Sequence, residues 1–173
     1  MIESIFEVLK QGMAIALLFN SNVAEINSDL YNDVPLYCMA QNIYHEARGE
    51  SRKGQIGVAF VTINRVKHSN YPDDICGVVH QGPTYTNWKG NEWPIPFQCQ
   101  FTWDCDGRSD DIENVNAWNE SVKVAAVVMT GLLTDPTHGA THYYNPKKAS
   151  PNWGFPITAY IGDHAFCKMP STT

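Results

Sequence analysis

The sequence predicts an α+β domain, mainly helical, with a small antiparallel sheet near the C-terminus. Apolar residues recur at helical spacing in three segments between positions 36 and 130, and short strand-like runs appear only after position 139. The length of 173 residues and the hydrophobic share of 43% suit one globular domain. Because helices precede strands and no βαβ unit or internal repeat is found, the α+β class is favoured.

The first helix is predicted from Leu36, with Gly49 as the residue that ends it. Its apolar residues follow the i, i+3, i+4, i+7 pattern of one buried stripe: Leu36, Met39, Ala40, Ile43, Tyr44 and Ala47. A second helix, Gln55–Val66, is hydrophobic nearly all round and is expected at the centre of the fold. Its polar members Thr62, Asn64 and Arg65 therefore need partners inside the protein.

A long stretch rich in Pro, Gly, Trp and Cys, residues 70–111, is expected to be an irregular functional loop. Asn114 or Asn116 can cap a third helix, which Gly131 would end. Strands are predicted at 140–145, 157–161 and 164–169, the last two joined by a turn at residues 162–163.

The chain divides into an N-terminal segment, residues 1–35, and a functional domain, residues 36–170. The apolar run Gly12–Phe19 is too short to span a membrane in the usual way. It is either a weak export signal or a packing helix. The acidic residues Glu3 and Glu7 argue against the signal, because a signal peptide begins with a positively charged region. We expect no stable membrane insertion.

A net charge of −6 with only twelve Lys and Arg leaves no basic stripe, so nucleic acid is not expected as a partner. Many aromatic residues follow Tyr71, either as core or as exposed rings that grip sugars. Five Cys suit one or two disulfides and a leftover thiol outside the cytoplasm, or else reduced buried Cys. Cys99 and Cys105 are near enough to bridge, and Cys76 competes for either partner.

The stretch "NIYHEARGE", residues 42–50, allows three interpretations. A zinc-protease motif needs a second His at position 49, which is Gly. His138, His142 and His164 lack ligand-like spacing, so we expect no metal or cofactor. A solvated salt-bridge cluster at a helix end is the second interpretation.

The third interpretation is an acid catalyst. Glu46 follows Met39 by seven residues and Ile43 by three, so its carboxyl lies along the buried stripe. Burial disfavours the charged form and raises a carboxyl pKa, which is the property required of a general acid. Enzymes that cleave glycosidic bonds use such an acid to protonate the leaving oxygen.

Several motifs in order, from about Cys38 to Cys167, resemble the SleB-type cell wall hydrolase family: "YHEARGESRKGQIGVAFVTINRV", "YPDDICGVV", "CQFTWDCDG", "GATHYYNP" and "IGDHAFC". The resemblance implies a lysozyme-like fold. It also implies a lytic transglycosylase or muramidase that cleaves the bond between N-acetylmuramic acid and N-acetylglucosamine in peptidoglycan, with Glu46 as the acid.

The resemblance further implies groove or scaffold roles at other motif positions. Substrate-binding residues are expected among Glu50, Gln100, Phe101, Tyr144, Asn145 and His164, with Asn64 and Gly162 also on motif positions. The Cys-bearing motif looks like the stand-alone enzymes of Gram-negative bacteria and their phages. This favours an endolysin role over spore germination. We expect a monomer that acts in the periplasm or cell wall after export or phage-mediated release, with cytoplasmic accumulation before lysis as the alternative.

A single-acid transglycosylase is preferred over a hydrolytic muramidase, which would need a second carboxylate. Glu50, Asp104 and Asp106 are the candidates for that second group. A wall-binding or phage structural protein that keeps the groove without catalysis is the alternative from another class.

Overall fold

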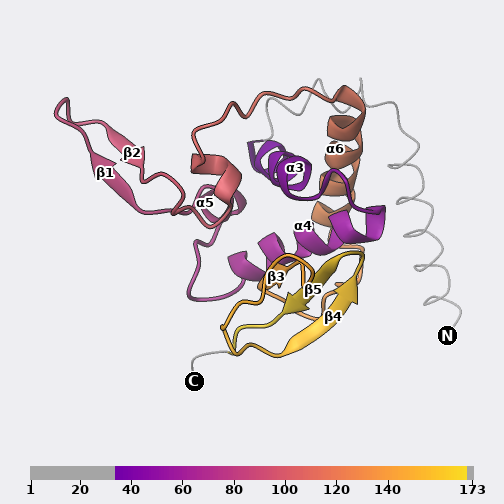
Figure 1. Cartoon of the computed structure of the whole chain (residues 1–173). Coiled ribbons are helices and arrows are strands. Elements are labelled where there is room, and N and C mark those ends of the chain that lie inside the picture. The colour runs from indigo at the N-terminus through magenta and orange to yellow at the C-terminus, as the bar shows by residue number, and fades with distance from the viewer. Residues whose placement is uncertain (1–33, 171–173) are drawn as a thin grey trace, which may run out of the picture.

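The computed structural model describes residues 34–170, in which helices lie against one face of a small sheet (Figure 1). In chain order the elements are α3 (Val34–Ala47), α4 (Arg52–Val66), α5 (Ile75–Val79), β1 (Thr84–Thr86), β2 (Glu92–Pro94), the 3₁₀ helix η1 (Thr102–Cys105), α6 (Val115–Met129), β3 (His142–Tyr144), β4 (Ile157–Ile161) and β5 (His164–Cys167). The helices, the later antiparallel sheet and their order confirm the predicted α+β class.

The predicted N-terminal segment, with its alternatives of export signal and packing helix, falls on residues 1–33, outside the described range, apart from its last two residues. Those two residues, Val34 and Pro35, belong to α3. Within residues 34–170, no helix has both the length and the apolar character needed to cross a bilayer.

The main core lies between α3, α4 and α6. Met39, Ile43 and Tyr44 of α3 are fully buried against Phe60 of α4 and Val122 of α6. The stripe predicted for the first helix is therefore the stripe that packs. Asn114 is the N-cap of α6, its side chain accepting from the backbone N–H of Ala117 at 3.0 Å.

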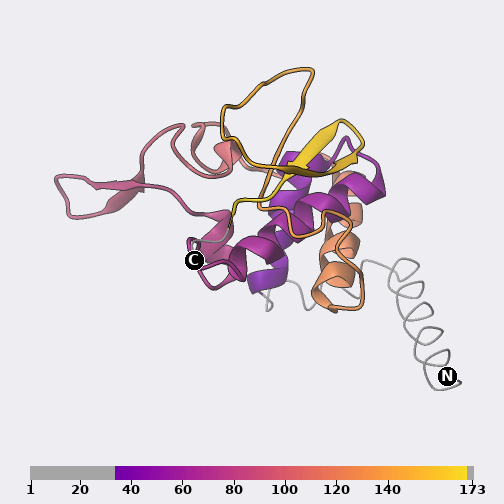
Figure 2. The same ribbon diagram turned by 90° about the horizontal axis from the view of Figure 1, so that it is seen from below.

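Helix α4 is central, because it also covers the three-stranded antiparallel sheet, whose order is β3-β5-β4. Val61 packs on Ile161 and Phe166 of that sheet (Figures 1 and 2). Gly57 permits the close approach, since a Cβ there would lie 2.7 Å from the Phe166 ring. The predicted burial of this helix on most sides is confirmed.

The boundary after the first helix was predicted on partly wrong grounds. Helix α3 ends at Ala47, and the N–H of Glu50 donates to the Ala47 carbonyl at 2.9 Å in the turn that follows. Gly49 is in that turn but does not take the left-handed conformation of a helix-ending glycine. Helix α4 then begins three residues before Gln55, capped by Ser51, whose side chain accepts from the Gly54 N–H at 3.3 Å.

The stretch of residues 70–111 is more ordered than predicted. It contains α5, η1 and a hairpin of β1 and β2 that projects away from the body in both ribbon views (Figures 1 and 2). Short three-residue strands with exposed aromatic side chains give little alternation, so the sequence pattern did not reveal the hairpin.

Candidate active site

A cavity of about 360 Å³ lies where the helical part meets the sheet. Its walls come from segments far apart in the chain: Glu46 at the end of α3, Arg65 near the end of α4, and residues 100–102 of the loop before and into η1. Strand β3 adds His142 and Tyr143, and the loop before β4 adds Trp153. The central position of α4 brings these walls together.

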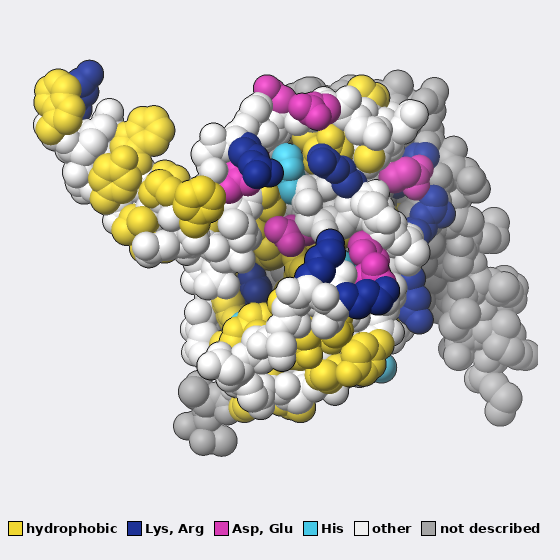
Figure 3. Space-filling model, viewed as in Figure 1, with side chains coloured by type: hydrophobic (Ala, Val, Ile, Leu, Met, Phe, Trp, Pro, Cys, Tyr) yellow, Lys and Arg dark blue, Asp and Glu magenta, His cyan; other side chains and the backbone are white. Residues whose placement is uncertain are grey.

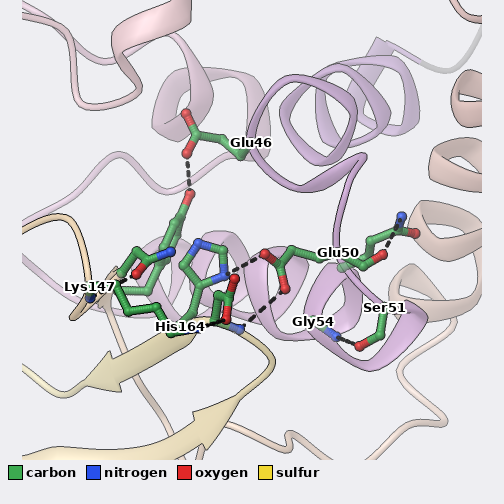
Figure 4. Close-up of polar contacts among 10 residues, drawn as sticks. Glu46, Glu50, Ser51, Gly54, Lys147 and His164 are labelled. Atoms are coloured by element: carbon green, nitrogen blue, oxygen red, sulfur yellow. Dashed lines mark hydrogen bonds and ion pairs between the residues drawn. The ribbon is translucent and has the colours of Figure 1, made fainter.

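Glu46 is partly buried in this cavity, as the helical periodicity predicted. The Tyr143 hydroxyl donates a hydrogen bond to its Oε2 at 2.7 Å (Figure 4). Burial raises the pKa of Glu46 above its ordinary value of 4.5, while this hydrogen bond and the nearby His164 and Arg65 oppose the rise. The carboxyl is therefore disposed to hold a proton, yet has partners that stabilise its charged form.

Tyr143 remains a neutral donor to Glu46. Loss of solvation and the adjacent Glu46 carboxyl raise the pKa of Tyr143 well above its ordinary value. Its ring lies against His164 at 5.2 Å and Phe166 at 5.8 Å between centroids. The strand pairing of β3 with β5, in which Tyr143 faces Phe166, fixes the position of the hydroxyl.

Arg65 supplies positive charge to the cavity wall. Its side chain is buried, at 5% exposure, and its Nε donates to the Thr141 carbonyl at 2.8 Å. The guanidinium lies over Phe101 and Tyr71, 5.0 and 5.2 Å from the ring centroids. Its Nη1 is buried and has no hydrogen-bond partner among the described residues.

A cluster of aromatic side chains lies on the side of the cavity next to β3. His142 lies 4.9 Å from both Trp153 and Phe155, and Tyr144 lies 6.0 Å from Trp153, measured between ring centroids. Burial and the nearby charge of Arg65 lower the pKa of His142 to about 4. This imidazole is therefore neutral near pH 7 and acts as a flat wall with hydrogen-bonding nitrogens.

The structure brings three of the predicted site residues into one cavity: Glu46, Gln100 and Phe101. Tyr144 and Asn145 are not among the lining residues; Tyr144 contacts Trp153, and Asn145 Oδ1 accepts from the Lys147 N–H at 2.9 Å in a turn. Asn64 holds a loop in place, with its Nδ2 donating to Asp135 and to the Ala140 carbonyl, both at 2.9 Å.

Glu50 and His164 form a separate pair. Glu50 Oε1 lies 3.8 Å from His164 Nδ1, and its Oε2 accepts from the Asp163 N–H at 3.5 Å (Figure 4). A Cβ at Gly162 would collide with the same carboxylate. Glu50 therefore ties the start of α4 to the turn between β4 and β5, and its side chain is only 20% exposed, less solvated than a helix-end position suggested.

The other two carboxyls considered from the sequence point elsewhere. Asp104 Oδ1 lies 2.6 Å from His80 Nδ1, and this hydrogen bond raises the pKa of His80. Asp106 is 3.9 Å from Arg108 and lines a different cavity. Of the described residues that line the 360 Å³ cavity, Glu46 alone carries a carboxyl group.

Sequence reasoning missed five of the lining residues: Arg65, Thr102, His142, Tyr143 and Trp153. One signal was present for Arg65, a charge in a helix that is apolar nearly all round. Strand alternation separates Tyr143 from Tyr144 but does not say which of them faces Glu46.

Two disulfides are present, Cys38–Cys76 and Cys99–Cys105, and Cys167 is a buried free thiol. The predicted bridge between Cys99 and Cys105 is confirmed. The competing role given to Cys76 was wrong, because α3 and α5 pack together and bring it to Cys38 instead. Within residues 34–170, no group of three His, Cys, Asp or Glu side chains is arranged to hold a metal ion.

A family model described as cell wall hydrolase matches residues 49–167. The chain belongs to the cell wall hydrolase family. Glu46 lies just before the matched segment, so its role depends on the geometry above.

Relatives and solved structures agree with this family. The spore cortex-lytic enzyme of Halalkalibacterium halodurans is 32% identical over 139 residues, which cover 79% of this chain and 36% of the relative. That of Bacillus subtilis is 30% identical over 139 residues, or 79% of this chain and 38% of the relative. The chain thus spans well under half the length of these relatives.

Two solved structures of catalytic domains share the fold. The catalytic domain of the Bacillus cereus SleB protein is 29% identical, with a TM-score of 0.55 over 78% of this chain and 89% of that one. The catalytic domain of the germination-specific lytic transglycosylase SleB from Bacillus anthracis is 30% identical, with a TM-score of 0.56 over 78% and 93%. This cell wall hydrolase therefore has the SleB catalytic fold, as the sequence motifs implied.

Proposed function

We propose that this chain is a peptidoglycan-degrading glycosidase that cleaves the bond between N-acetylmuramic acid and N-acetylglucosamine as a lytic transglycosylase. The observation that carries the proposal is that Glu46, with its pKa raised by burial, is the single carboxyl among the described residues that line the cavity. The names of the relatives, a spore cortex-lytic enzyme and a germination-specific lytic transglycosylase, support the same substrate and reaction.

In the first step of the proposed reaction, protonated Glu46 gives its proton to the glycosidic oxygen. The bond between that oxygen and the anomeric carbon of N-acetylmuramic acid breaks, and the departing sugar leaves as an alcohol. The ring becomes positively charged, and Glu46 becomes a carboxylate. The Tyr143 hydroxyl and the positive charge of Arg65 stabilise that carboxylate.

In the second step, the Glu46 carboxylate accepts the proton of the 6-hydroxyl of the same N-acetylmuramic acid residue. The 6-oxygen then bonds to the anomeric carbon, which closes a 1,6-anhydro ring and restores protonated Glu46. The proton is conserved over the cycle, and no water is consumed. One carboxyl with a pKa set between opposing influences can serve as acid and then as base.

A hydrolytic muramidase is supported less well. Hydrolysis generally uses a second carboxylate, about 5 Å from the acid for retention or roughly 6.5–9.5 Å for inversion. Glu50 faces His164, and Asp104 faces His80, and neither lines the cavity.

The two disulfides support a place of action outside the cytoplasm, on the wall or in the periplasm after export or phage-mediated release. We propose that the protein acts there as a monomer.

The test is digestion of purified peptidoglycan in ¹⁸O-labelled water, followed by mass spectrometry of the products. We expect unlabelled fragments that end in 1,6-anhydro-N-acetylmuramic acid and are lighter than hydrolysis products by one water. Labelled reducing ends as the main product would make the enzyme a hydrolase. Absence of any glycan cleavage would leave a wall-binding protein as the better description.

A further inference from the structure

The hairpin of residues 83–97, here called the arm, carries the largest set of exposed rings in the described part of the chain. Tyr85 is 50% exposed, Trp88 89%, Trp93 53% and Phe97 68%. Every residue of β1 and β2 is exposed, so no other described element covers either strand. Figure 3 shows these hydrophobic side chains along a projection that extends away from the body.

The register of the hairpin gives it two different faces. Tyr85 pairs with Trp93 directly across the strands, so both rings project from the same face. The pairs on either side, Thr84 with Pro94 and Thr86 with Glu92, belong to the other face. Trp88 lies in the tip, with Lys89 Nζ 4.8 Å from its ring centroid.

The base of the arm is closed by a hydrogen bond between its two ends and is fixed to the end of η1 by a second. The Ile95 N–H donates to the Pro83 carbonyl at 2.9 Å, and the Phe97 N–H donates to the Cys105 carbonyl at 3.0 Å. The Cys99–Cys105 disulfide follows, and Gly82 permits close contact with it, since a Cβ there would lie 2.9 Å from Cys99 Sγ. An isolated two-stranded hairpin is marginal in water, so these contacts hold the arm in place.

The chain passes directly from the arm into residues 100–102, which line the cavity with Glu46. Along the chain, only residues 98 and 99 separate the arm from these lining residues. We propose that the arm is a secondary binding platform for the same glycan strand, on which sugar rings stack against Tyr85, Trp88 and Trp93. This inference rests on the proposed function, because the polymer in question is the glycan that Glu46 would cleave.

The chemistry of the arm fits a carbohydrate better than a bilayer or a second protein. Near its exposed rings the arm carries the hydrogen-bonding side chains of Asn87 and Asn91, and the two kinds of group together match the C–H and hydroxyl surfaces of a sugar. The arm has one Lys and one Glu, so it lacks the basic face that attracts anionic lipid.

Binding is tested with variants on the Glu46→Gln background, so that the polymer stays intact. We compare Trp88→Ala/Trp93→Ala with the matched control Thr84→Ala/Thr86→Ala on the opposite face, using co-sedimentation with purified insoluble peptidoglycan. We expect dissociation constants about tenfold higher for the Trp variant and within about twofold of the parent for the Thr variant. Circular dichroism confirms that all variants are folded.

A second measurement uses the same substitutions with Glu46 intact. The ratio of kcat/KM on long glycan strands to kcat/KM on a tetrasaccharide should fall about tenfold in the Trp variant and stay at the wild-type value in the Thr control. Unchanged binding and an unchanged ratio would overturn the platform. The platform would also be overturned if the Trp variant lost binding to phosphatidylglycerol vesicles while its binding to peptidoglycan stayed undiminished.

These outcomes separate the two proposals. If the wild-type enzyme forms anhydro products and the Trp variant binds peptidoglycan normally, the arm inference alone fails. If no glycan is cleaved but the Trp variant of the Glu46→Gln protein loses binding, the proposed reaction fails and the platform stands.

Discussion

Replacing Glu46 by Gln tests the proposed acid while keeping the shape of the site. The amide retains an oxygen that can accept the hydrogen bond from Tyr143, which Glu46 Oε2 accepts at 2.7 Å, but it cannot donate a proton to the glycosidic oxygen. None of the other described residues that line the cavity carries a carboxyl that could take over. We therefore expect kcat to fall by about 10²- to 10⁴-fold, or about 3–5 kcal/mol of transition-state stabilisation.

The same substitution should not destabilise the protein. Because burial raises the pKa of Glu46 in the folded state, its contribution to stability is fully present below the ordinary pKa and is lost as pH rises through the folded-state value. Glutamine stays neutral and avoids that loss. We expect Tm at neutral pH to equal or exceed that of the wild-type protein, as seen in thermal unfolding followed by circular dichroism.

The assay is the loss of turbidity of a peptidoglycan suspension, with anhydro products counted by mass spectrometry. Glu50→Gln is the matched control, since Glu50 is the other Glu of the motif but faces His164. We expect it to keep activity within about tenfold and to lose about 1 kcal/mol of stability from its contacts with the β4–β5 turn. A folded Glu46→Gln protein with near wild-type activity would refute the assignment.

Three further predictions concern the surroundings of the site. Tyr143→Phe removes a hydrogen bond that lowers the pKa of Glu46, so the pKa of Glu46 should rise. Because the acid acts only when protonated, the fall of kcat/KM on the alkaline side should move to higher pH. An unmoved pH profile would contradict this. Thiol counting in denaturant without reductant should find one free thiol. Because a longer closed loop constrains the unfolded chain more, removing the Cys38–Cys76 bridge, with a separation of 38, should lower the free energy of unfolding by about 4 kcal/mol, against about 2 kcal/mol for Cys99–Cys105, with a separation of 6. Equal losses of stability in urea unfolding would count against this. Gly162→Ala should destabilise by about 1–3 kcal/mol, because φ is 59° there and a Cβ would strike the Glu50 carboxylate; an unchanged urea midpoint would exclude that clash.

Local patterns determined much of this protein. The spacing of Met39, Ile43 and Glu46 placed a carboxyl on the buried side of the first helix, because 3.6 residues per turn fixes which residues share a face. The second helix was predicted to be central because its residues are apolar on nearly all sides. The short separation of Cys99 and Cys105 allowed their disulfide, and the ordered motifs carried the family and fold.

Only the tertiary structure decided which groups meet. Tyr143, rather than Tyr144, reaches Glu46 because the pairing of β3 with β5 selects the face, and Glu50 turns to His164 because the β4–β5 turn closes over it. Cys38 bonds to Cys76 because α3 and α5 pack together. These contacts join residues from 38 to 114 positions apart, beyond the reach of any helical or strand period, so the position of each partner is set by packing of the whole domain.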